Sequence, residues 1–82
     1  MYYAIQKQSW SKGHQQTRLL GFRSMKDRNE FLKNRTSSQM DLQYETILRS
    51  ELTNKEIKTF KTFAQYGVTT EGIVVYSVVL YR

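Results

Sequence analysis

The sequence predicts one α+β domain spanning residues 1–82, with a mixed four-stranded sheet carrying two helices. Three observations predict this fold. Strand-like patterns occupy both ends of the chain, two segments with capping signals lie between strand patterns, and no repeat, linker or low-complexity segment separates them. The order along the chain is β-β-α-β-α-β. Each helix links two strands, so right-handed crossovers are expected wherever the flanking strands run parallel.

The first two strands are predicted to form a hairpin. Residues 2–8 are rich in Tyr and Ile and are typical of a strand. Residues 9–16 are polar and include Gly13, which indicates the hairpin loop. Residues 17–23 then form the returning strand.

The first helix is predicted to begin after Ser24 and to fade near Arg35. Ser24 and Asp27 fit the S-x-x-D capping pattern, in which each side chain satisfies an otherwise unpaired backbone N–H. The residues after Arg35 are Thr and Ser, which favour loops over helices. The side chains expected to point inward are Met25, Phe31 and Leu32.

Residues 41–49 alternate between two sets of side chains, which predicts a half-buried strand. One set would face the core and the other would face solvent. The two sets are Leu42, Tyr44, Thr46, Leu48 and Gln43, Glu45, Ile47, Arg49.

The second helix has the clearest start and stop patterns. Thr53 is the expected N-cap, Glu56 completes a capping box, and Leu52 is placed to pack on Ile57 as a hydrophobic staple. Gly67 suits the left-handed position that follows a helix. The expected apolar stripe consists of Ile57, Phe60, Phe63 and Ala64.

The last strand is predicted over residues 73–81, after a turn at Glu71-Gly72. Both of its faces are apolar, which places it inside the sheet with both faces covered. If both helices lay on one face, the other would be buried by self-association into a homodimer or by a partner. That helix-free face would carry Val74, Tyr76, Val78 and Leu80, or Ile73, Val75, Val79 and Tyr81. The alternative is that the helices lie on opposite faces, or that the first hairpin curls over the sheet, which leaves a closed monomeric core.

Composition argues against catalysis and against a cofactor. Cysteine is absent, which excludes disulfides and thiolate chemistry, and one His with seven scattered acids makes a metal site unexpected. No Gly-rich phosphate loop occurs. With no Cys and no signal-peptide pattern, a cytoplasmic location is expected. The longest apolar run, about eight residues, is far below the roughly 20 that cross a bilayer, so no membrane partner is expected.

The positive charge lies in the first part of the chain. Residues 1–35 carry eight basic and two acidic residues, a net charge of +6, whereas residues 36–82 carry five of each. Such an excess favours phosphates or an acidic protein surface, although it also suits solubility alone. Lys55, Lys58 and Lys61 repeat at three-residue spacing and would add to a binding surface only if they continued the basic first helix in space.

The candidate binding residues follow from this charge and from the hairpin loop. The single Trp lies among basic residues of the loop, and Trp is enriched at binding hot spots. The alternative is that this Trp folds back over the sheet edge as part of a small core. The candidates are Trp10, Lys12, His14, Arg18, Arg23, Arg28 and Lys33.

Part of the chain resembles a group of known proteins. The residues concerned are a Tyr-rich first strand, the segment SWSKG at residues 9–13, Leu20-Gly21-Phe22, Arg28 with Phe31-Leu32, and ILRSE at residues 47–51. This arrangement, over about two thirds of the chain, is similar to small, poorly characterised proteins encoded by phages and prophages. The resemblance implies an accessory protein that binds a host factor or defence complex in the host cytoplasm, and it transfers no catalytic residue.

Three functions therefore stand as hypotheses. The first is a non-enzymatic, phage-type accessory or inhibitor protein that binds a host protein or a nucleoprotein complex. The second is direct nucleic-acid binding by the basic first 35 residues, although no known nucleic-acid-binding motif is present. The third is an RNA-cleaving toxin that would use Lys, Arg and Tyr side chains, with Arg18, Arg23, Arg28 and Lys33 as candidates.

Overall fold

The computed structural model describes residues 1–9, 13–35 and 42–81. Its sheet has five strands in the order β3-β1-β2-β5-β4, and every neighbouring pair is antiparallel. The strands are β1 (Tyr2–Ser9), β2 (Gln15–Phe22), β3 (Leu42–Ile47), β4 (Gln65–Val68) and β5 (Val74–Leu80). The helices are α1 (Met25–Arg35), α2 (Asn54–Phe63) and a short 3-10 helix (Arg49–Glu51).

The predicted α+β class with two helices is confirmed, but the four-stranded mixed sheet is wrong. The segment Gln65–Val68 forms β4, paired with the first half of β5, and no pair in the described sheet is parallel. Gly67 lies within β4 opposite Val75 and is not a left-handed helix cap, because α2 already ends at Phe63. The turn at Glu71-Gly72 is confirmed, since Gly72 has a φ of 85°.

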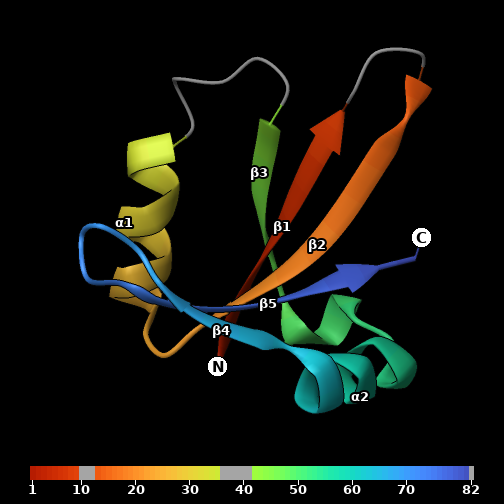
Figure 1. Cartoon of the computed structure of the whole chain (residues 1–82). Coiled ribbons are helices and arrows are strands. Elements are labelled where there is room, and N and C mark those ends of the chain that lie inside the picture. The colour runs from red at the N-terminus through yellow and green to blue at the C-terminus, as the bar shows by residue number, and fades with distance from the viewer. Residues whose placement is uncertain (10–12, 36–41, 82) are drawn as a thin grey trace.

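The two helices lie on opposite faces of the sheet (Figure 1). Successive side chains of a strand point to opposite faces. In β1, Tyr3 and Ile5 pack with residues of α2, whereas Ala4 between them packs with Phe31 of α1. The prediction of a helix-free sheet face is therefore wrong. β5 lies between β2 and β4, so its predicted interior position is confirmed.

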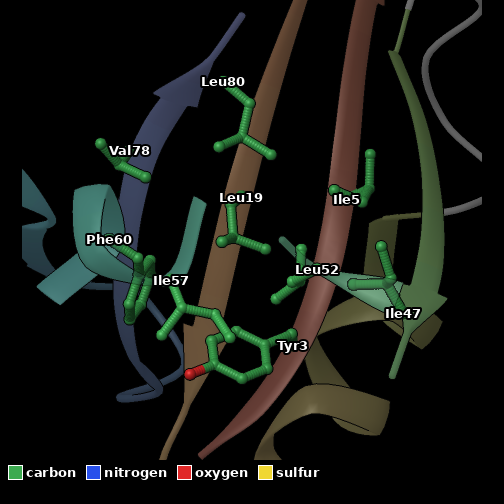
Figure 2. Packing of buried hydrophobic residues seen from close by; sticks show 9 residues of the cluster. All are labelled: Tyr3, Ile5, Leu19, Ile47, Leu52, Ile57, Phe60, Val78 and Leu80. Carbon is green, nitrogen blue, oxygen red and sulfur yellow. The ribbon is translucent and has the colours of Figure 1, made fainter. Parts of the chain in front are cut away.

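The larger hydrophobic cluster fills the space between the sheet and α2 (Figure 2). Phe60 of α2 meets Tyr3 edge to face, with ring centroids 5.4 Å apart. Phe60 also crosses β2 closely at Gly21, where a Cβ atom would overlap its ring and approach the sulfur of Met1 to 2.6 Å. The buried members are Tyr3, Ile5, Leu19, Ile47, Leu52, Ile57, Phe60, Val78 and Leu80.

The smaller cluster joins α1 to the other face. Phe31 is buried, with its ring 5.1 Å from that of Phe22 and 5.8 Å from that of Tyr44. Ser24 caps the helix as predicted, since its hydroxyl accepts the N–H of Asp27 at 3.1 Å. Met25 is exposed, so its predicted inward position is wrong.

The start of α2 follows the predicted capping box. The Thr53 hydroxyl accepts the N–H of Glu56 at 3.1 Å, and the Glu56 carboxylate accepts the N–H of Thr53 at 3.0 Å. Leu52 and Ile57 are both buried in the same cluster, as the hydrophobic staple predicts. Of the predicted stripe, Ile57 and Phe60 are buried, but Phe63 is 68% exposed because it ends the helix beyond the sheet core.

β3 is shorter than the predicted strand and faces the core differently. Ile47 is buried, and Leu48 is exposed. The strand stops at Ile47 because the chain turns into the 3-10 helix, and the Leu48 N–H donates to the Glu51 carboxylate at 2.9 Å. Asp41, the predicted first residue of this strand, lies outside the described residues.

A charged contact ties the end of α1 to the turn between β4 and β5. Two guanidinium nitrogens of Arg35 donate to the two carboxylate oxygens of Glu71, at 3.1 and 3.3 Å. These hydrogen bonds, together with those from the Glu71 backbone and Thr69, lower the pKa of Glu71 from 4.5 to about 2. The Arg35 guanidinium also lies 4.0 Å from the centroid of the Phe31 ring, which fixes it over the smaller cluster.

This contact predicts a defined pH dependence of stability. The pKa of Glu71 is lower in the folded state, so its contribution is complete above about pH 4.5 and is lost as pH falls towards 2. The thermal midpoint of Glu71→Gln should therefore lie below that of the wild type at pH 6, and the difference should shrink between pH 4.5 and 2. Glu30→Gln, at an exposed position on α1, is the control. A difference that persists unchanged at pH 2 would contradict this role.

Candidate functional site

The candidate residues chosen from the sequence do not form one patch. Trp10 and Lys12 lie outside the described residues. His14 is exposed at the end of the β1–β2 hairpin, and Lys33 is exposed on α1. Arg18 lies in β2 opposite Val79, and its side chain is half-buried.

The remaining two arginines have aromatic partners in different places. Arg23 donates a hydrogen bond of 3.0 Å to the hydroxyl of Tyr76 on the α2 side of the sheet. Its pKa is raised, mainly by that hydrogen bond. The Arg28 guanidinium lies 5.9 Å from the centroid of the Tyr2 ring. The basic first 35 residues therefore spread over several surfaces.

The lysine row of α2 does not continue the basic first helix. α1 and α2 cover opposite faces of the sheet, so their exposed charges point away from each other (Figure 1). Within the row, Lys55 and Lys61 line different hollows, one beside the end of β5 and one beside the start of β1. The lysines of α2 and the basic residues of α1 therefore do not form a single basic surface.

The structure instead reveals an incomplete edge along β5. β4 pairs only with Val74 to Ser77, so no strand in the described part of the chain lies beside residues 78–80 on that side. The residue that would lie opposite Val79 is Phe63, which belongs to α2. The position that β4 would occupy if it continued past Gln65 is therefore not filled by a strand of the described residues.

Three hollows meet along this open edge, and Val79 and Tyr81 line all of them. Their volumes are about 460, 650 and 260 Å³, and together they run from the start of β4 to the β1–β2 hairpin. We call this surface the edge groove. The side chains that define it are His14, Arg18, Lys55, Thr59, Phe63, Val79 and Tyr81.

The backbone of Val79 points into the edge groove. The carbonyl of Ile73 accepts the N–H of Thr69 at 2.9 Å, so the polar backbone groups of Ile73 face β4. These groups alternate from side to side along a strand, which directs those of Val75, Ser77 and Val79 to the same edge. β4 provides the pairing partners for the backbone groups of Val75 and Ser77. Among the described residues, none pairs with Val79 on that side.

The walls of the edge groove are aromatic and basic. Phe63 is 68% exposed and Tyr81 is 95% exposed, which is unusual for such large side chains. Arg18 and Lys55 bring positive charge, and neither forms a salt bridge with any described residue. The acidic lining residue Glu56 is engaged in capping α2. An open strand edge between such walls suits an extended, acidic segment of a partner.

Several residues of the edge groove escaped the sequence prediction. The sequence assigned Phe63 to the core, Lys55 to a row of lysines on the second helix, and Val79 to a strand with both faces covered. One pattern could have revealed the site: Val68 and Val74 flank the turn residues Thr70 to Gly72, as in a hairpin. That hairpin would have ended the helix earlier and exposed Phe63.

Among the described residues, no group of three or more His, Asp or Glu side chains is placed to hold a metal ion. No helix in the described part of the chain has the length and apolar character needed to cross a membrane.

Comparison of the chain with protein-family models, curated proteins and solved structures gives no match. The fold and the edge groove define a small α+β domain with an incomplete sheet.

Proposed function

We propose that this chain is a non-enzymatic binding protein, a phage-type accessory or inhibitor protein that captures an extended segment of a host protein or nucleoprotein complex. The observation that carries the proposal is the backbone of Val79 on the floor of the edge groove, which no residue in the described ranges pairs on that side. An added strand would satisfy this N–H and carbonyl and would continue the line of β4.

The charge of the edge groove favours an acidic partner over a second copy of the chain. Arg18 and Lys55 line the groove, and the chain carries a net charge of +6. Two such edges brought together would place like charges against each other, which opposes association. The side chains of β4 are all exposed, as are half of those of β3, but neither strand carries a basic residue comparable to Arg18 and Lys55 of the edge groove.

Charge reversal tests this function. Arg18→Glu should weaken capture of the partner by roughly tenfold or more, because it places repulsion inside the edge groove. The assay is a pull-down from bacterial lysate with mass spectrometry, before and after nuclease treatment, followed by affinity measurement on the captured protein. Lys26→Glu, an identical charge change on exposed α1, is the matched control.

The outcomes separate the hypotheses. A nuclease-resistant partner that is retained by Lys26→Glu and lost by Arg18→Glu supports strand capture by the edge groove. Loss of every partner after nuclease treatment would support direct nucleic-acid binding instead. Equal binding by both variants would reject the edge groove as the site.

A further inference from the structure

A second surface lies on the α2 side of the sheet, beside the start of β1. A cleft of about 560 Å³ opens there between α2 and the sheet, a size typical of small-ligand sites. Its apolar walls come from Tyr3, Phe60, Ala64 and Tyr76. None of these four residues lines the edge groove, so the two surfaces are separate.

Aromatic surface continues from the cleft onto β4. Tyr66 lies directly opposite Tyr76 across the β4–β5 pair, and their rings meet edge to face with centroids 5.6 Å apart. Tyr66 is exposed, and so is Val68 two residues further along the same face. α2 therefore leaves an aromatic strip of the sheet uncovered next to the cleft.

Three basic side chains from three different segments line the cleft or contact its Tyr76 wall. Arg49 and Lys61 lie on the rim of the cleft, and Arg23 holds the Tyr76 hydroxyl at 3.0 Å. No described lining residue of the cleft is acidic, and none of the three forms a salt bridge with a described residue. Lys61 also offsets the negative C-terminal end of the α2 dipole.

We propose that this surface, the aromatic-basic cleft, binds single-stranded nucleic acid. A base would stack on Tyr66 or enter the cleft against Tyr76, and the phosphates on either side would contact Arg23, Arg49 and Lys61. Exposed aromatic rings flanked by cations are the means by which proteins bind single strands without sequence preference. A duplex keeps its bases stacked inside and would offer only its phosphates. This activity goes beyond the proposed capture of a protein segment and does not depend on it.

Fluorescence anisotropy with labelled 12-nucleotide dT and rU strands tests the proposal on the intact chain. The wild type should bind, and log affinity should fall with log salt with a slope of about −2 for three neutralised phosphates. Tyr66→Leu should weaken binding about tenfold without changing that slope, because it removes stacking alone. The double variant Arg49→Gln/Lys61→Gln should weaken binding and flatten the slope to about −0.7.

Lys26→Gln, at an exposed position on α1, is the matched control and should bind as the wild type does. Thermal melts of all variants check whether the fold is kept. Absence of saturable binding at 50 mM salt would overturn the proposal. If Lys26→Gln weakened binding as much as Arg49→Gln/Lys61→Gln does, the proposal would also be overturned, because net charge alone would then explain binding. Equally tight binding of a duplex or of a poly-glutamate peptide, insensitive to Tyr66→Leu, would overturn it as well.

Discussion

Phe60→Ala is expected to lower the free energy of unfolding by about 3–5 kcal/mol, the largest stability effect we predict for a single substitution. Phe60 is only 5% exposed and is the aromatic anchor of α2 on the sheet. Its ring meets Tyr3 edge to face and packs over Gly21, so truncation leaves a cavity that the rigid strands cannot close (Figure 2). Urea denaturation followed by circular dichroism measures the change.

Phe63→Ala is the matched control for this prediction. It makes the same change three residues later in α2, at a side chain that is 68% exposed. The free energy of unfolding should stay within about 0.5 kcal/mol of the wild type. The same variant should weaken partner capture, because Phe63 is a wall of the edge groove. Equal destabilisation by the two variants would show that α2 does not pack on the sheet with Phe60 buried and Phe63 exposed.

Gly21→Ala is expected to destabilise the domain by about 1–3 kcal/mol, although alanine is normally tolerated in a strand. The added Cβ would overlap the Phe60 ring and approach the Met1 sulfur to 2.6 Å. Because β2 is held between β1 and β5, the backbone has little freedom to move away. α2 must therefore shift, and with it the packing of the larger cluster.

Gly67→Ala separates this steric effect from the general effect of adding a methyl group to a strand. Gly67 lies in the edge strand β4, where the nearest atom to a new Cβ is the Val75 carbonyl oxygen at 3.9 Å. Its free energy of unfolding should stay within about 0.5 kcal/mol of the wild type. A stable Gly21→Ala variant would contradict the close approach of α2 to β2. Thermal melts of both variants are sufficient to decide.

The parts of the fold that were predicted correctly depend on local patterns. The starts of both helices follow from Ser24 and from the Thr53 and Glu56 box, because a cap is made within four residues. The first hairpin and the last strand also follow from runs of strand-forming residues around turns. The turn at Gly72 follows from a residue that adopts a positive φ without strain.

The errors concern pairings between distant parts of the chain. The four residues of β4 are all exposed, and four residues are too few for their alternation to indicate a strand, so it is their pairing with β5 that defines them as one. The same pairing ends α2 at Phe63, which a helical pattern alone extends further. Strand order and the placement of helices on the two faces depend on the whole sheet, and local periodicity does not contain that information.

The candidate site illustrates the same limit. Charge counting identified Arg18, the hairpin loop indicated His14, and both lie along the edge groove. It also selected Arg28 and Lys33 on α1, on the opposite side of the sheet from α2. The defining feature, an unpaired backbone at Val79, depends on where β4 stops and leaves no mark in the composition.

Hydrogen exchange of the β5 amides, measured by NMR in the free protein and in its complex, tests directly whether a partner strand pairs with Val79. Val78 and Leu80 lie opposite β2 residues and direct their amides towards β2, whereas the Val79 amide faces the edge groove. Strand capture predicts that the Val79 amide exchanges rapidly in the free protein and becomes protected on binding. The amides of Val78 and Leu80 should be protected in both states. Binding that leaves the Val79 amide exchanging as fast as in the free protein would contradict the account.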